Sequence, residues 1–377
     1  MRNLLTRCLA ALAGGIALIA AIPLHAAPHA GMDGTVVTPM VLRGGGGYVP
    51  GNWVDANVPS SPFSGVVSVS IRFDLNTPNA AGYICSGALL SDFHVLTAAH
   101  CIDKLDDGNA MTLDANNDVR VRFNHNNPTS DFAGTTQIVA SAVTMHPGYQ
   151  GFGNCPAGSP SSWFCLNDDL AIITLSQAAP VQAARYSVLG TGMQGGELIT
   201  MVGYGTSGTG HVGHQSGTAN FYVKKSGQNV VDLFDWDDET YFANGPSEVW
   251  YADFDGTDMR GQFQDTFCQL ALACSAALGD GVEGNIGGGD SGGPSFMWLN
   301  GQYVLVGNNT FGGTYPDQVS GTFGTYFGGM SLAAYGSFLS QATGGTVTLV
   351  PEPETYAMML AGLGAVLLIA RRRRQRG

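Results

Sequence analysis

The chain has 377 residues and a formal net charge of −13, with 29 acidic residues against 16 basic ones. Residues 27–350 hold nine of the basic residues and 27 of the acidic ones, so this stretch carries a net charge of −18. A surface of this sign repels nucleic acid and other anionic polymers, and no basic stripe offsets it, which excludes nucleic acid as a partner. The stretch is long enough for one large or two small domains.

The first 26 residues have the pattern of a secretory signal peptide. Arg2 and Arg7 supply a positive start, residues 9–22 are apolar apart from two glycines, and Ala26 ends a cleavage site with a small residue. We therefore expect cleavage after Ala26 and export of the rest. Residues 27–62, which are rich in Gly and Pro, are predicted to form a flexible leader or propeptide.

From residue 63 onward the hydrophobic pattern is typical of strands. Apolar residues alternate with polar ones over residues 67–73, and the same period of two recurs over residues 119–123. Glycine-rich turns separate these runs, and a helical period first appears between Leu332 and Leu339. The pattern predicts an all-β fold that ends in a helix.

Three motifs carry residues suited to nucleophilic catalysis. His100 ends the run LTAAH, Asp169 directly precedes an apolar run, and Ser291 lies in the hexapeptide GDSGGP at residues 289–294. A serine hydroxyl attacks an amide when an imidazole takes its proton, and a buried carboxylate must fix the tautomer of that imidazole. The glycines let backbone N–H groups converge on the oxyanion of the tetrahedral intermediate. The three motifs together predict a catalytic triad.

The order His, Asp, Ser and the flanking motifs resemble those of the chymotrypsin/trypsin family. The resemblance covers residues 63–340 and implies two six-stranded antiparallel Greek-key barrels with a short C-terminal helix. It implies His100 as base and acid, Asp169 as the residue that orients it, and Ser291 as nucleophile. The N–H groups of Gly289 and Ser291 would form the oxyanion hole. Asp168 would be a solvated neighbour of the triad.

The same resemblance implies a serine endopeptidase. Such an enzyme hydrolyses the peptide bonds of a polypeptide substrate through an acyl-enzyme intermediate and needs no cofactor. An alternative from another class is a non-catalytic envelope or biofilm-matrix binding protein built on the protease scaffold. Proteins of that kind usually lose a member of the triad, and this chain has all three.

The cysteines fit an oxidising compartment. Cys8 would leave with the signal peptide, and six cysteines remain, an even number that suits disulfides. In the family a disulfide closes the loop of the catalytic histidine, which implies the pair Cys85 with Cys101. The simplest further pairs are Cys155 with Cys165 and Cys268 with Cys274. The chain has no CxxC and no paired histidine near these cysteines, so we expect no zinc site.

Two segments depart from the family pattern. Residues 150–164 form an insertion that is either a stapled surface loop or a wall of the substrate cleft. Residues 232–258 hold nine acidic residues, which could bind calcium or form a solvated acidic loop. No run in the chain has a complete EF-hand spacing, so we favour the solvated loop and expect no metal.

The substrate pocket and the activation step follow from the resemblance. In the family the floor of the primary pocket lies six residues before the nucleophile, here Asn285, and Thr310 and Gly312 would line its wall. An uncharged floor predicts a neutral residue before the scissile bond. Family zymogens pair a newly cut N-terminal amine with the aspartate before the nucleophile, here Asp290. No basic junction of the usual kind is visible, so either another protease cuts the leader or Asp290 is held another way.

The C-terminal end resembles a PEP-CTERM sorting tail. After a linker at residues 341–350, the tail at 351–377 contains Pro-Glu-Pro, an uncharged apolar run at 356–370 and four consecutive arginines. The run predicts a transmembrane segment, although it is short for a permanent span. The arginines should stay in the cytoplasm. The resemblance implies export across the inner membrane of a Gram-negative bacterium, transient anchoring, removal of the tail by an exosortase-type enzyme, and a mature protein in the cell envelope or outside the cell.

Overall fold

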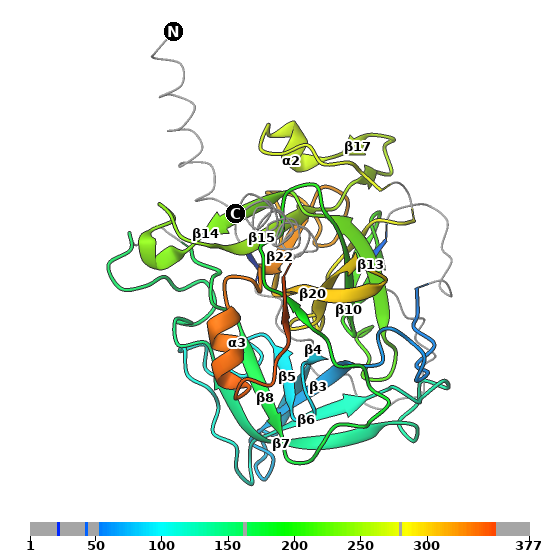
Figure 1. The fold of residues 1–377 in the computed structure, drawn as a ribbon. Coiled ribbons are helices and arrows are strands. Elements are labelled where there is room, and N and C mark those ends of the chain that lie inside the picture. Colours follow the sequence, from blue (N-terminus) through cyan, green and yellow to red (C-terminus); the bar gives the residue numbers. More distant parts are fainter. Residues whose placement is uncertain (1–20, 23–41, 44–52, 161–163, 279–280, 352–377) are drawn as a thin grey trace, which may run out of the picture.

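A computed structural model of the chain describes residues 21–22, 42–43, 53–160, 164–278 and 281–351. Strands account for nearly all of its regular structure (Figure 1), so the all-β prediction is confirmed. The predicted signal peptide except residues 21–22, most of the leader and the transmembrane segment lie outside the described residues. Within the described part, none of the helices combines the length and the apolar character needed to cross a membrane.

The first half of the protein is a closed six-stranded barrel, in the lower part of Figure 1. All of its strand pairs are antiparallel. In barrel order the strands are β3 (Val66–Phe73), β4 (Ala81–Leu89), β5 (His94–Thr97), β8 (Ala171–Leu175), β7 (Thr136–Met145) and β6 (Asp118–Phe123).

The alternation in β6 has the burial that the sequence predicts. Val119, Val121 and Phe123 are fully buried, whereas Arg120 and Arg122 remain partly exposed. In β3 both faces are buried, because its polar residues face the second half of the protein. Ser68 donates its hydroxyl to the carbonyl oxygen of Phe221 there, at 2.8 Å.

The second half contains two larger sheets. A six-stranded sheet has the order β13 (Lys225–Val230), β10 (Leu198–Gly203), β19 (Pro294–Leu299), β20 (Gln302–Asn308), β9 (Val188–Leu189) and β23 (Leu349–Val350). A five-stranded sheet has the order β1 (Ala21–Ile22), β21 (Phe311–Gly313), β22 (Tyr326–Met330), β15 (Ser247–Asp253) and β14 (Leu233–Trp236). A single bridge between Gly307 and Ser331 joins them.

The two sheets of the second half enclose a common core. Met201 of β10 and Val306 of β20 pack with Trp250 of β15 and Phe327 of β22 in one buried cluster. The second expected barrel is therefore present as two sheets around shared hydrophobic side chains, with backbone pairing less continuous than in the first. Hydrophobic burial holds the two sheets together where hydrogen bonds between them are few.

The remaining elements are short. The strands are β2 (Leu42–Arg43), β11 (Ser207–Thr209), β12 (Gly213–Gln215), β16 (Gly256–Thr257), β17 (Phe263–Gln264) and β18 (Gly284–Asn285), and the helices are η3 (Asp238–Thr240), α2 (Thr266–Gln269) and α3 (Gly336–Ala342). Helix α3 is the closing helix that the sequence predicts. It buries Phe338 and Leu339, and the ring of Phe338 lies 4.9 Å from that of His146, just after β7.

The folded part extends beyond the boundaries 63 and 340. Asn57, assigned from the sequence to the leader, is fully buried and donates its side-chain amide to the carbonyl oxygen of Tyr222 at 2.9 Å. Val54 pairs with Lys225 of β13. At the other end, β23 lies in the expected linker and pairs in parallel with β9. Backbone hydrogen bonds and burial thus include both segments in the domain, which composition alone does not reveal.

The structure pairs the six described cysteines as the sequence analysis expected. The disulfides are Cys85–Cys101, Cys155–Cys165 and Cys268–Cys274, with S–S distances of 2.02, 2.05 and 1.98 Å. The first joins β4 to the turn after β5, across 16 residues of sequence. By chain entropy a loop of this size contributes about 3 kcal/mol to stability.

Candidate active site

His100 and Asp169 form the most specific polar contact of the site. The Nδ1 of His100 lies 2.6 Å from Oδ2 of Asp169, and the backbone N–H of His100 donates to Oδ1 of the same carboxylate at 2.8 Å. The Asp169 side chain is 1% exposed and that of His100 is 12% exposed. Two bonds to one buried carboxylate fix both the position of the loop and the orientation of the ring, with Nε2 directed away from Asp169.

The local fold explains how these two residues meet. His100 lies three residues after β5 and Asp169 lies two residues before β8, and β5 and β8 are antiparallel neighbours in the barrel. Thr97, which ends β5, is paired with Ala171, which begins β8. The two side chains therefore leave the barrel at the same edge.

Ser291 lies in a loop between β18 and β19, and this loop is docked on the first barrel. The carbonyl oxygen of Ser291 accepts the N–H of Ser86 in β4 at 2.8 Å, and the hydroxyl of Ser86 donates to the carbonyl oxygen of Gly289, also at 2.8 Å. Gly289 has a φ of +99° and Gly292 a φ of +76°, which favour glycine. Ser86 thus fixes the loop of Ser291 to the barrel that carries His100.

The disulfide beside His100 also marks the approach of the two halves. The sulfur of Cys101 lies 3.8 Å from Nε2 of His100 and 3.8 Å from the carbonyl oxygen of Ser291. Ser291 itself is fully buried in this structure. The structure therefore brings His100, Asp169 and Ser291 to one place, at the junction of the two halves.

The insertion at 150–164 reaches the same place. The ring of Phe152 packs edge-on against that of His100, with the ring centroids 5.5 Å apart, and Phe164 packs against Phe152 at 6.2 Å. Of the two alternatives for this segment, the contact favours a wall of the site over a remote surface loop. No sequence pattern marks this contact apart from the position of the insertion before Asp169.

The expected pocket residues lie in the second half. Asn285 is 2% exposed, its side-chain amide donates to Oγ1 of Thr325 at 3.0 Å, and its own Oδ1 accepts the N–H of Ile286 at 2.7 Å. Thr310 is fully buried, and Gly312 is in β21 with partial exposure. The side chain of Asn285 is thus neutral and already hydrogen-bonded.

Asp290 has a buried cation near it that sequence reasoning missed. Its oxygens accept the N–H groups of Gly205 at 2.7 Å and of Gly287 at 2.9 Å. Lys225 is fully buried in β13, and its ammonium group donates to the carbonyl oxygen of Gly205 and to the hydroxyl of Ser207. Burial lowers the pKa of Lys225 to about 8, and the charge of Asp290 opposes that shift. A lysine inside a strand gives no signal in the sequence, because lysine is rarely buried.

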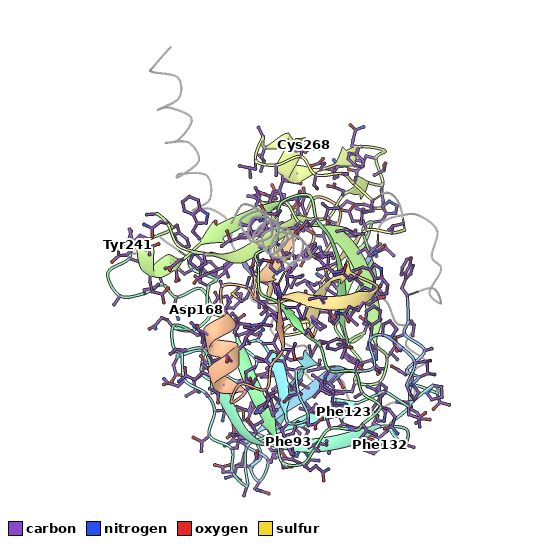
Figure 2. The ribbon with its side chains drawn as sticks, viewed as in Figure 1. Phe93, Phe123, Phe132, Asp168, Tyr241 and Cys268 are labelled. Atoms are coloured by element: carbon purple, nitrogen blue, oxygen red, sulfur yellow. A yellow bond between two sulfur atoms is a disulfide. The ribbon has the colours of Figure 1, made fainter. Side chains whose placement is uncertain are left out.

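The expectation of a solvated Asp168 is wrong. Asp168 is 2% exposed, and its backbone N–H donates to the hydroxyl of Tyr335 at 3.0 Å, directly before α3. Figure 2 shows Asp168 beside this helix. The acidic segment at 232–258 is not wholly solvated either, since Asp238 is 4% and Glu248 7% exposed. Segments distant in sequence cover these carboxylates, which a local pattern does not reveal.

Two sequence families match parts of this chain. Residues 53–238 match the trypsin family, and residues 349–374 match the PEP-CTERM protein-sorting motif. The chain is also 28% identical over 236 residues to chymotrypsin-like elastase family member 1 of Bos taurus, across 61% of this chain and 68% of that protein. The trypsin match includes His100 and Asp169 and ends before Ser291. The chain therefore contains a trypsin domain, followed by a C-terminal PEP-CTERM sorting motif.

Proposed function

We propose that this protein is an exported serine endopeptidase in which His100, Asp169 and Ser291 form the catalytic triad. The observation that carries the proposal is the double hydrogen bond from His100 to the buried carboxylate of Asp169. This arrangement suits an imidazole that must accept a proton at Nε2, because the carboxylate holds the other nitrogen as N–H and stabilises the imidazolium. The docking of the Ser291 loop on the barrel of His100 supports the assignment of the nucleophile.

The chemistry would proceed in two stages. His100 takes the proton of the Ser291 hydroxyl while the oxygen attacks the carbonyl carbon of the scissile peptide bond. The N–H groups of Gly289 and Ser291 stabilise the resulting oxyanion, and His100 returns the proton to the leaving amine. A water molecule, activated by the same imidazole, then hydrolyses the acyl-enzyme and restores Ser291.

We propose a preference for a neutral residue before the scissile bond. The buried Asn285 would form the floor of the pocket, with Thr310 and Gly312 on its wall. An amide that is already bonded to Thr325 cannot replace a carboxylate as partner for a lysine or arginine. Peptide ester substrates that differ only in this residue test the preference: alanine, valine or leucine should be cleaved at least ten times faster than lysine, and faster cleavage after lysine would contradict it.

The tail and the signal peptide support a location outside the cytoplasm. The PEP-CTERM match at 349–374 fits membrane anchoring during export, followed by removal of the tail by an exosortase-type enzyme. The substrate would then be a polypeptide of the cell envelope or of the extracellular space.

Labelling with a fluorophosphonate tests the proposal against the alternative of a non-catalytic binding protein. The exported protein should become modified at Ser291, as shown by the mass of the peptide that contains this residue. The Ser291→Ala variant should stay unlabelled, and His100→Ala should react far more slowly because the hydroxyl is no longer activated. A folded protein that does not react would contradict the proposal and favour the binding protein.

A further inference from the structure

Five acidic side chains from three separate segments lie close together around Asp168, the residue before Asp169. They form what we call the acidic cluster: Asp168, Asp237, Asp238, Glu239 and Glu248. Asp168 precedes Asp169 in the chain, Asp237 caps η3, and Glu248 belongs to β15. The cluster is thus made by the tertiary fold.

The carboxylate oxygens of the acidic cluster converge. One oxygen each of Asp168, Asp238 and Glu239 lie within 4.8 Å of one another, and so do oxygens of Asp237, Glu239 and Glu248. Glu239 is common to both groups, so the five side chains surround one region.

Two members of the cluster are buried without the partners that buried carboxylates need. Asp168 is 2% exposed, and its Oδ2 has no hydrogen-bond partner among the described residues. Asp238 is 4% exposed, and the same is true of its Oδ1. A buried ionised oxygen without a donor costs more free energy than a neutral polar group, so these atoms point to a positively charged ligand.

Basic side chains do not balance the cluster. Among the ion pairs of the described residues, its single basic contact is His146, whose Nδ1 lies 2.9 Å from Oδ1 of Asp168. Among these ion pairs the carboxylates of the cluster thus face one imidazole and neither a lysine nor an arginine.

Gly148 borders the cluster. A Cβ atom at this position would lie 2.2 Å from Oδ2 of Asp168 and 2.9 Å from Oε1 of Glu239. Any side chain at 148 would thus displace two of the carboxylates. The position can carry glycine alone without disturbing the arrangement of oxygens.

We propose that the acidic cluster binds one calcium ion, with Asp168, Asp238 and Glu239 as ligands and Asp237 and Glu248 completing the site. The donors are all carboxylate oxygens, the ligands of hard cations. Among the described residues no cysteine belongs to the two carboxylate groups, and the imidazole of His146 already contacts Asp168. Calcium suits a site of several flexible carboxylates better than magnesium, which demands near-ideal octahedral geometry and retains its waters.

The ion would position Asp169 through the backbone. Asn167 donates its side-chain amide to Oε2 of Glu248 at 2.8 Å and to the carbonyl oxygen of Trp236 at 3.0 Å. Calcium between Asp168 and the η3 segment would add a third link between the same two parts of the chain. It would hold the segment 167–169 in place without touching the substrate, so its ligands are positioning residues.

Calcium titration of the Ser291→Ala protein tests this proposal, since that variant avoids self-digestion. After treatment with a chelator, calorimetry should detect one calcium ion per chain, and calcium should raise the melting temperature. Magnesium should bind at least ten times more weakly. Asp238→Asn and Glu248→Gln should each weaken calcium binding at least tenfold. Both variants remove one negative charge from the cluster and so reduce the repulsion between its carboxylates. In chelator their melting temperatures should therefore not fall below that of the Ser291→Ala protein.

A second buried acidic group provides the matched control. Oxygens of Asp253, Asp255 and Asp265 also lie within 4.8 Å of one another. Asp255→Asn should leave the calcium affinity of the acidic cluster unchanged. Gly148→Ala should weaken binding without removing a ligand. The proposal is overturned if the protein binds no calcium at millimolar concentration, or if binding survives Asp238→Asn and is lost in Asp255→Asn.

Discussion

Lys225 and Asp290 contact the same residue, Gly205, through its two backbone polar groups. The ammonium group of Lys225 donates to the carbonyl oxygen of Gly205, and Oδ1 of Asp290 accepts its N–H at 2.7 Å. Both side chains are buried, and burial raises the pKa of Asp290 while the charge of Lys225 opposes the shift. The sequence left open how the aspartate before the nucleophile is held. A cation inside the chain supplies one answer that requires no newly cut N-terminus.

Replacement of Lys225 should therefore damage the nucleophile loop. Lys225→Met leaves the buried Asp290 without a nearby cation, which should cost on the order of 3 kcal/mol in the free energy of unfolding. Adding Asp290→Asn should recover part of this loss, because the uncompensated charge is gone. Urea unfolding measures both effects.

Lys104→Met provides the control, because Lys104 pairs with Asp74 at the surface at 2.9 Å. It should cost less than about 1 kcal/mol. If Lys225→Met proved as stable as this control, Asp290 would not depend on Lys225. A protein that retains residues 27–52 of the leader should also remain active, since the counter-charge does not come from a terminal amine.

The sequence predicted those parts of the fold that follow from local pattern. The alternation at 119–123 identified the buried face of β6, because the other face of that strand meets solvent. The corresponding alternation in β3 could not show that Ser68 is buried as well, because that burial depends on Phe221, far along the chain. An apolar run after Asp169 distinguished it from Asp168. The burial of Asp168 depends on Tyr335 and on the η3 segment, which no local pattern connects to it.

The site was predictable where a motif fixes both residue type and backbone conformation. The glycines of residues 289–294 indicated a tight backbone that lets N–H groups converge, and Gly289 and Gly292 have positive φ angles. Lys225 and Phe152 carry no such mark, because their importance comes from a position that only tertiary packing creates. Both became visible through their contacts with Gly205 and His100.

The triad should behave as one catalytic unit. Ser291→Ala and His100→Ala should each lower turnover by a factor on the order of a million, and the double variant should be little worse than either. Asp169→Asn should keep the fold and lower turnover roughly ten-thousandfold, because the imidazole takes the wrong tautomer. Steady-state kinetics in saturating calcium measures these losses. The assignment would be contradicted if the loss of turnover in the double variant equalled the product of the two single losses. A larger loss from Asp168→Asn than from Asp169→Asn would also contradict it.

The second acidic group should make stability depend on pH. Burial and neighbouring acids raise the pKa of Asp253 to about 7 and of Asp255 to about 9, from an ordinary value of 3.8. Burial also raises the pKa of Glu283, which accepts the N–H of Asp255, to about 7 from 4.5. At pH values between the unfolded and the folded pKa of each group, the folded state therefore holds more protons than the unfolded state. The resulting stabilisation is complete below the unfolded pKa values and is lost as pH rises through 7 to 9.

Melting temperatures at pH 5, 7 and 9 in chelator check this dependence. They should fall as pH rises, and Asp255→Asn should flatten the decline because its amide does not titrate. Asp232 and Asp265 also face Asp255 and contribute to its shift, so the dependence should be reduced rather than abolished. The exposed Asp317 serves as the control, and Asp317→Asn should leave the slope unchanged. An equal slope in Asp255→Asn and the parent protein would refute the assignment.

The tail should determine where the protein is released. The uncharged run at 356–370 is short and ends in four arginines, so it should enter the inner membrane with Gly377 in the cytoplasm and remain until processing near Pro351-Glu352-Pro353. Replacing Arg371 to Arg374 by neutral residues should weaken anchoring, since these charges hold the end inside. Replacing Pro-Glu-Pro should instead leave the anchor intact and block release, which would retain an active protease at the membrane.

Cell fractionation and C-terminal mass spectrometry of the mature chain separate these outcomes. The two tail variants should differ in compartment although neither changes a residue before 351. Equal fluorophosphonate labelling of both would show that folding is unaffected. Removal of the tail should yield a mature C-terminus near the Pro-Glu-Pro motif. This motif directly follows β23, the last strand of the described fold, which pairs with β9. A mature protein that still ends at Gly377 would mean that the run is a permanent anchor, and release by sorting would be ruled out.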